Sequence, residues 1–309
     1  VEDLKTYFEL PAGMVKAVDG VSFQLAPGKT LGVVGESGSG KSTLALAVAG
    51  LLTAAEGQIK FMNEDVTSMT SSQIMGYRKK ISFIWQNSIG SLSPRMSVGS
   101  LITEGYKIHN LKDRDLKMEA DRLLKLVGLP TNIRERYAHE LSGGQARRVG
   151  VARAIALDPK LIIADEPTAG LDVSVQGEIL NLLNKLRDDL GVSLFVITHN
   201  LNIVRHISDR TAVMYLGRFV EQGQTDDIFA KPRHPYTLAL LSANLTPYQE
   251  TSLKNKIELT GEVPSLMDRP NGCEFHTRCP FSSKHCDDEF PPVHTFNGQQ
   301  ILTCHYPLK

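Results

Sequence analysis

A glycine-rich loop between an apolar run and an Ala- and Leu-rich segment constrains the fold of this chain more than any other feature. Residues 30–34 (T-L-G-V-V) predict a short buried strand, residues 35–43 read G-E-S-G-S-G-K-S-T, and residues 42–52 predict a helix. The loop fits G-x-x-x-x-G-K-[ST], in which backbone N–H groups converge on phosphate oxygens at a helix N-terminus. A plain Gly-Ser turn would not require this strand and helix around it.

Each position of the loop has an expected part in phosphate binding. Lys41 would neutralise the β- and γ-phosphates, and Ser42 would ligate the Mg²⁺ that bridges them. The predicted phosphate-binding residues are Gly35, Glu36, Ser37, Gly38, Ser39, Gly40, Lys41, Ser42 and Thr43. A nucleoside triphosphate with Mg²⁺ is therefore the expected ligand.

Two acidic residues follow a second apolar run. Residues 161–164 (L-I-I-A) predict a strand, and Asp165 and Glu166 come directly after it. Asp165 would hold Mg²⁺ through water, and Glu166 would orient and polarise an attacking water. Alone, such a pair could simply solvate a loop, but after a phosphate loop it indicates hydrolysis of the nucleotide.

The rest of the chain alternates predicted strands with predicted helices. Further strands are expected at 18–23 and 194–198, a hairpin at 211–221, and helices at 113–127, 145–157 and 175–190. This alternation predicts a mostly parallel α/β sheet.

Two changes in residue pattern and composition along the chain predict the domain organisation. Residues 87–158 are expected to form a helical insert between two strands, within a nucleotide-binding domain of residues 1–231. Pro, His and Cys become frequent after residue 232, so residues 232–309 are expected to form a separate C-terminal region.

Composition argues against several classes of partner. The 34 Lys and Arg residues balance 34 Asp and Glu residues, which gives no electrostatic reason to expect nucleic acid as a partner. No apolar run approaches the roughly 20 residues that span a bilayer, and no leader pattern opens the chain, so we expect no export. The region before residue 273 contains no Cys, as suits a reducing compartment.

The segment L-S-G-G-Q at residues 141–145 lies between the phosphate loop and the acidic strand end. That order resembles the ATP-binding cassette (ABC) ATPase family, which implies an α/β P-loop core with a helical subdomain. In that family the segment completes the ATP site of a second subunit. The resemblance gives this signature role to Ser142, Gly143, Gly144 and Gln145, and a helix N-cap by Ser142 is compatible with it.

Three more family motifs can be matched to single residues. Gln86 resembles the Q-loop glutamine that senses Mg²⁺ and water, His199 resembles the switch histidine, and Asp172 belongs to a D-loop that contacts the opposite subunit. The chain departs from the usual pattern at Asn200, where the family has Asp, and at Gly170 in the D-loop. Tyr7 or Phe8 could stack on adenine if residues 11–13 form a longer loop.

Finer features resemble the ATPases of oligopeptide and dipeptide importers. They include S-L-S-P-R at 91–95, which is closer to the F-type than the D-type subunit, and H-P-Y-T at 234–237. The resemblance implies a D-type partner ATPase, two membrane permeases, an extracytoplasmic solute-binding protein and a place on the cytoplasmic face of the inner membrane. Nickel and glutathione are alternative solutes. A soluble non-transport ABC ATPase and an iron–sulfur redox enzyme are the rival functions.

The four cysteines cluster near the C-terminus with the spacing C-x5-C-x6-C-x17-C. Four thiolates can ligate a [4Fe–4S] cluster or one Zn²⁺, and free thiols or disulfides are further alternatives. Resemblance to the importer ATPases favours a structural [4Fe–4S] cluster. Its expected ligands are Cys273, Cys279, Cys286 and Cys304, with His276, His285, His294 and His305 as possible substitutes.

Overall fold

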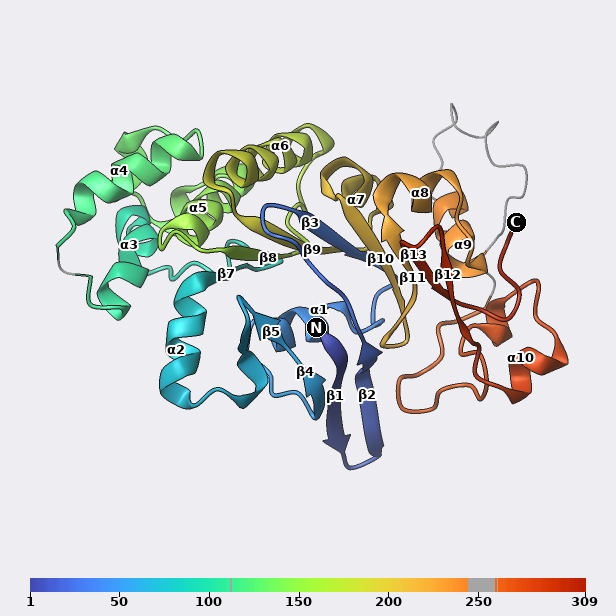
Figure 1. Cartoon of the computed structure of the whole chain (residues 1–309). Coiled ribbons are helices and arrows are strands. Elements are labelled where there is room, and N and C mark those ends of the chain that lie inside the picture. The colour runs from blue at the N-terminus through green and yellow to red at the C-terminus, as the bar shows by residue number, and fades with distance from the viewer. Residues whose placement is uncertain (112, 244–258, 260) are drawn as a thin grey trace. The chain divides into compact units, whose positions relative to one another are not determined.

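The computed structural model describes residues 1–111, 113–243, 259 and 261–309. The chain divides into two compact units, and Figure 1 shows the helices and strands of the chain coloured by residue number. The first unit comprises residues 1–24, 30–68 and 197–309, and the second comprises residues 25–29 and 69–196.

The first unit contains most of the strands. Its strands are β1 (Glu2–Leu10), β2 (Gly13–Val21), β3 (Thr30–Val34), β4 (Glu56–Gln58), β5 (Lys60–Phe61), β6 (Glu64–Asp65), β10 (Arg210–Tyr215), β11 (Arg218–Gln224), β12 (Val293–Phe296) and β13 (Gln300–Thr303). Its helices are α1 (Lys41–Val48), α7 (Leu201–Ile207), α8 (Thr225–Ala230), α9 (Pro235–Ala243) and α10 (Lys284–Asp288), with 3-10 turns η1 (Val66–Ser68) and η4 (His276–Arg278).

Three sheets contribute strands to this unit. One is antiparallel with the order β2-β1-β4, another includes β12-β13-β11-β10-β3 in that order, and β5 pairs with β6 in a small third sheet. β10 runs parallel to β3 and antiparallel to β11. The strand that leads into the phosphate loop, β3, therefore lies beside a strand from the last third of the chain. Helix α7 packs on β3 so closely that a Cβ at Gly32 would lie 2.7 Å from Val204.

The second unit carries more helix. Its elements are α2 (Ser71–Lys80), β7 (Ile81–Ile84), α3 (Val98–Ile108), α4 (Leu116–Leu126), η2 (Thr131–Glu135), η3 (Ala138–Glu140), α5 (Gly143–Ile155), β8 (Leu161–Asp165), α6 (Val173–Leu190) and β9 (Ser193–Thr198), whose last residues cross the unit boundary. β7 and β8 pair in parallel. The hydroxyl of Tyr106 on α3 donates to Ala156 O over 2.6 Å just after α5.

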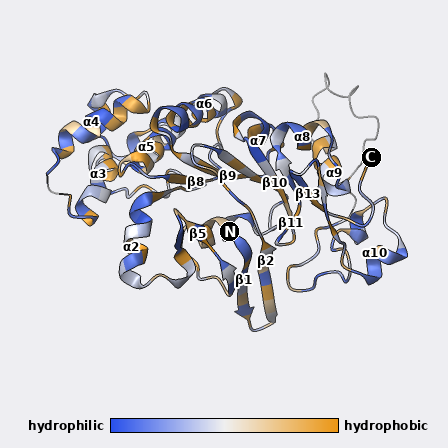
Figure 2. Ribbon diagram, viewed as in Figure 1, coloured by the Kyte–Doolittle hydropathy of each residue, from blue (hydrophilic) through white to orange (hydrophobic). Residues whose placement is uncertain are grey.

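The strands that precede functional loops are apolar and buried. All residues of β3 and of β8 are buried, and Figure 2 shows β8 coloured mainly as hydrophobic. Side chains buried on both faces are typical of parallel strands covered by helices. Among the described residues, no helix has both the length and the apolar character needed to cross a bilayer.

The α/β prediction is confirmed, and several boundaries differ from it. The predicted helix at 42–52 ends at Val48, because Gly50 adopts a left-handed φ of 65°. The predicted strand at 18–23 is the second half of a hairpin, whose β1 partner was missed. The strands β12 and β13 were also missed, because short strands in a Pro- and Cys-rich segment lack a clear alternation.

Candidate functional site

The phosphate loop leads from β3 into α1 and is folded around its own lysine. The Nζ of Lys41 donates to Gly35 O over 2.8 Å, to Glu36 O over 2.7 Å and to Ser39 Oγ over 3.2 Å. The lysine is only 7% exposed. A buried ammonium group requires such partners. These three hydrogen bonds hold the Lys41 ammonium group in the first unit, at the N-terminus of α1.

Glycine is required at the end of this loop. Gly40 has φ 98°, and a Cβ there would lie 2.0 Å from Ala17 O. Side chains other than hydrogen are therefore excluded both by backbone conformation and by space. The close approach of β2 explains why the motif ends in Gly-Lys in this fold.

Residues distant in the sequence hold the loop in place. The Gly217 N–H after β10 donates to Ser39 O over 2.9 Å, and the Glu36 N–H donates to the Tyr236 hydroxyl over 3.0 Å. Arg278 forms a paired contact with the Glu36 carboxylate. The loop thus depends on β10, α9 and the C-terminal region.

His199 also belongs to the first unit, and its side chain is exposed directly after β9. The next residue, Asn200, caps α7, since its Oδ1 accepts from the Asn202 N–H over 2.9 Å. Asn and Asp are both strong N-caps. The replacement of the usual Asp by Asn200 therefore keeps the helix start that follows the histidine.

In the second unit, β8 delivers the predicted acidic pair to its carboxyl end. Asp165 and Glu166 are both 8% exposed. Glu166 has φ 48°, a left-handed conformation that is costly for a residue with a side chain. Such strain persists where the surroundings impose it and is frequent at functional sites.

Arg147 on α5 joins two loops of the second unit, and the sequence analysis missed it. Its guanidinium donates to Trp85 O and Gln86 O, each over 2.9 Å, and to Ala169 O over 3.1 Å. The side chain of Gln86 itself is exposed. The position of an Arg two residues after L-S-G-G-Q was the only signal in the sequence for this role. The partners of Arg147 are backbone carbonyls, which no side-chain pattern reveals.

The signature segment begins α5 with a capping box. The Ser142 Oγ accepts from the Gln145 N–H over 3.2 Å, and the Gln145 Oε1 accepts from the Ser142 N–H over 3.1 Å. Ser142 and Gly143 are exposed. The predicted N-cap is confirmed, and it leaves the N-terminus of α5 accessible to an anion.

The D-loop residues lie beside this helix start. A Cβ on Gly143 would lie 3.6 Å from Leu171 Cδ2, and Gly170 has φ 73° with open space around it. Asp172 is the exposed N-cap residue of α6, and its carbonyl accepts from the Gln176 N–H over 2.8 Å. The signature and D-loop segments therefore share one surface of the second unit.

The aromatic side chains considered for adenine lie in β1. Leu10 pairs with Gly13, so the intervening residues form a two-residue turn rather than a longer loop. The Tyr7 hydroxyl donates to Asp19 Oδ1 over 2.5 Å. The condition for stacking by Tyr7 or Phe8 is therefore not met.

The four cysteines of the C-terminal region are free thiols, and three of them are buried while Cys279 is partly buried. The Cys273 N–H donates to Cys286 O over 2.8 Å. Burial raises the pKa of Cys273 to about 11 and that of Cys304 to about 12, and the neighbouring Cys side chains add to both rises. Among the described residues, no group of three or more His, Cys, Asp or Glu is arranged to hold a metal ion. The [4Fe–4S] cluster therefore stays a prediction.

Comparisons with known proteins bear on the whole chain. A family model described as "ABC transporter" matches residues 18–169, and one described as "Oligopeptide/dipeptide transporter, C-terminal region" matches residues 220–286. The oligopeptide transport ATP-binding protein OppF of Salmonella typhimurium is 43% identical, with 94% of this chain and 91% of that protein covered. AppF of Bacillus subtilis is 42% identical over 99% of this chain and 96% of its own length.

This chain belongs to the ABC transporter family of ATP-binding proteins. As a member it is an ATPase with an ABC-type fold. The structure resembles a dimeric ATP-binding cassette bound to ADP and Pi, with a TM-score of 0.67, 25% identity, and coverage of 72% of this chain and 97% of that one. It also resembles cbiO1 of Clostridium perfringens, with a TM-score of 0.63, 28% identity, and coverage of 74% of this chain and 91% of that one.

Proposed function

We propose that this ABC ATPase energises a membrane importer of oligopeptides or dipeptides. The observation that carries the proposal is the match to oligopeptide transport ATP-binding proteins along nearly the whole chain, the C-terminal region included. The family model for the C-terminal region of oligopeptide and dipeptide transporters matches residues 220–286, in addition to the match over the ATP-binding part. Nickel, glutathione or another small solute is the alternative cargo.

The proposed reaction assigns a part to each motif of the two units. Lys41, already surrounded by loop oxygens, would shift part of its hydrogen bonding to the β- and γ-phosphates. Ser42, Gln86 and Asp165 would hold Mg²⁺, directly or through water. Glu166 would orient and polarise the attacking water, and His199 would contact the γ-phosphate.

In this proposal, each ATP site is completed by hydrogen-bond donors from the signature segment of the second ATPase subunit. Ser142 to Gln145 form an exposed capped helix start, which suits a γ-phosphate carried by another chain. Two subunits would close head to tail around ATP, with Asp172 at the contact. We propose a D-type ATPase as that partner and two permeases as the membrane components, fed by an extracytoplasmic solute-binding protein.

The domain limits form part of the same proposal. Residues 1–231 would be the ATP-binding domain, with residues 87–158 as its helical subdomain, and residues 232–309 would be the importer-type C-terminal region. The complex would lie on the cytoplasmic face of the inner membrane. Co-purification of the tagged chain with two integral membrane proteins tests this assembly, and recovery with soluble proteins only would contradict it.

Replacement of Glu166 by Gln tests the proposed hydrolytic role. Glu166→Gln keeps the size of the side chain and removes its ability to polarise water, so hydrolysis should fall by about 10² or more while ATP binding persists. ATPase activity and equilibrium binding of a fluorescent ATP analogue measure the two effects. Glu178→Gln, an exposed residue of α6, is the matched control. Near-normal turnover in Glu166→Gln would overturn the assignment.

We also propose that the four cysteines hold a [4Fe–4S] cluster, with Zn²⁺ as the alternative. Burial and the neighbouring Cys side chains raise the pKa values of Cys273 and Cys304, so these thiols keep their protons unless a bound metal replaces them. The cluster would stabilise a region too small to build a large core of its own. Iron and sulfide analysis of anaerobically purified protein, with absorbance at about 400 nm, is the test. Stoichiometric zinc without iron would contradict the cluster.

A further inference from the structure

An ion pair connects the Cys-rich region directly to the phosphate loop. Arg278 Nη1 donates to Glu36 Oε2 over 2.7 Å, and its Nη2 donates to Glu36 Oε1 over 3.0 Å. The two bonds run in parallel between a planar guanidinium and a carboxylate, a geometry that fixes orientation as well as distance. The partners are 242 residues apart in the chain.

Both partners are held so that this geometry persists. The Arg278 side chain is 4% exposed and that of Glu36 is 25% exposed. The N–H of Arg278 donates to Phe275 O over 3.0 Å, and the Phe275 ring packs 5.3 Å from the rings of both Tyr215 and Tyr236. A pair with one side buried and ordered is screened less by solvent than an exposed one.

The same residue of the loop is held at its backbone. The Glu36 N–H donates to the Tyr236 hydroxyl, and the Glu36 carbonyl accepts from the Lys41 ammonium. Side chain, N–H and carbonyl of Glu36 are thus each bonded, two of them to the C-terminal part of the chain. The peptide that positions Lys41 is therefore anchored by residues that lie outside the ATP motifs.

We propose that Arg278 is a positioning residue of the ATPase, which preorganises the phosphate loop for ATP through Glu36. Preorganisation lowers the ordering cost at binding, so it acts on affinity more than on the chemical step. Arg278 touches neither phosphate nor water in this proposal. The inference requires no metal in the Cys-rich region, because it rests on the ion pair alone.

A double-mutant cycle tests the proposal on the full chain. The variants are Arg278→Gln, Glu36→Gln and the double substitution, with trinitrophenyl-ATP and Mg²⁺ as the binding probe. Each single variant should raise the Kd and the KM for ATP about three- to ten-fold, with kcat within about two-fold of the starting protein. The double variant should bind no worse than the weaker single variant, since both remove the same pair.

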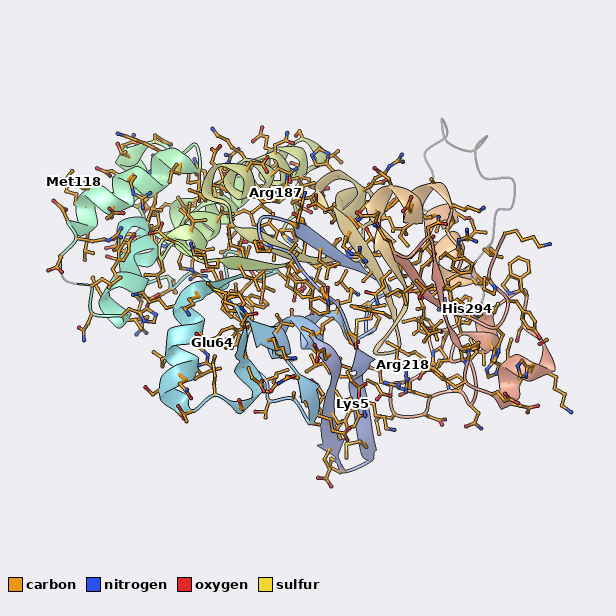
Figure 3. The ribbon with its side chains drawn as sticks, in the orientation of Figure 1. Lys5, Glu64, Met118, Arg187, Arg218 and His294 are labelled. Atoms are coloured by element: carbon orange, nitrogen blue, oxygen red, sulfur yellow. The ribbon has the colours of Figure 1, made fainter. Side chains whose placement is uncertain are left out.

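A second carboxylate in the same segment provides the matched control. Glu274 accepts from Arg269 over 2.8 Å and lies 3.4 Å from Arg218, which is one of the residues labelled in Figure 3, and neither of these partners belongs to the phosphate loop. Glu274→Gln should lower the melting temperature and leave the Kd for the analogue unchanged. Arg278→Lys, which keeps charge without the fork, should recover only part of the affinity.

Specific results would overturn the proposal. Unchanged affinity in folded Arg278→Gln would do so, as would losses that multiply in the double variant. If Arg278→Gln does not fold, Glu36→Gln still decides, because the Glu36 side chain is partly exposed and this substitution changes no residue of the C-terminal region. Normal affinity in folded Glu36→Gln would then exclude the positioning role.

Discussion

The phosphate loop and the signature segment are both glycine-containing turns that begin a helix, yet they are stabilised in different ways. The signature segment is capped by its own residues three positions apart, Ser142 and Gln145. The phosphate loop is held by Gly217, Tyr236 and Arg278, which are distant in the sequence. The signature segment is a local structure in which Ser142 and Gly143 stay exposed, and the phosphate loop is a tertiary structure in which Gly35, Ser39 and Lys41 are buried.

This difference matches the two tasks that we propose. An exposed capped helix start can meet the ATP of another subunit without rearranging its own unit. A loop that must surround phosphate needs its backbone N–H groups fixed before the ligand arrives. The comparison predicts that damage to the phosphate loop spreads through the first unit, whereas damage to the signature segment stays local.

The largest difference is expected between two Gly→Ala substitutions. Gly40→Ala should cost roughly 2–4 kcal/mol of unfolding free energy and abolish ATP binding, because the new Cβ meets a backbone carbonyl at positive φ. Gly143→Ala lies in the first turn of α5, where the new Cβ makes only an ordinary contact 3.6 Å from Leu171 Cδ2, and it should change stability by less than about 0.5 kcal/mol. Urea denaturation measures both. Equal losses in the two variants would contradict the contrast between the loops.

Lowering the pH should destabilise the protein through His234, which is bonded to Tyr236, a residue that holds the phosphate loop. Burial lowers the pKa of His234 to about 3, and its Nδ1 accepts from the Tyr236 N–H over 3.0 Å. Between the unfolded pKa of 6.5 and about 3, the unfolded chain binds the extra proton, so His234 makes stability fall as pH falls. The slope reaches about 1.4 kcal/mol per pH unit.

His234→Asn isolates this contribution, because Asn keeps an acceptor and does not titrate. Burial raises the pKa of the neighbouring Glu221, which acts with the opposite sign and is present in both proteins. Urea midpoints from pH 7 to pH 5 should therefore decline more steeply in the starting protein than in His234→Asn. Parallel curves would show that His234 is not buried in its neutral form.

The signature cap is expected to have a smaller effect on stability than Gly40 or His234. Ser142→Ala should cost about 1 kcal/mol, and Ser142→Asn should cost less because Asn is also a good cap. ATP binding by the isolated chain should be unchanged in both. Hydrolysis by the assembled complex should fall in both, since neither presents the serine hydroxyl. Thermal denaturation and ATPase assays measure these effects, and normal hydrolysis in Ser142→Ala would exclude the proposed role of the hydroxyl.

Much of the fold and of the site could be predicted because the relevant signals are local. The strands at 30–34 and 161–165 are continuous apolar runs, and the helices that follow start at recognisable caps or glycines. The hairpin partner β1 and the strands β12 and β13 were missed, since short or irregular strands give weak alternation. Arg147 was missed because its hydrogen bonds go to backbone carbonyls.

By itself, the sequence determined the order of motifs, the α/β class and the capped start of α5, because each depends on residues within a few positions of one another. Only the tertiary structure decided what surrounds the phosphate loop. Tyr236 and Arg278 meet Glu36 across 200 and 242 residues, and contacts at such separations are set by the path of the whole chain. A single polar pair produces no periodic pattern, so the sequence alone does not predict it. The ion pair between the Cys-rich region and the phosphate loop could therefore be found only in the folded protein.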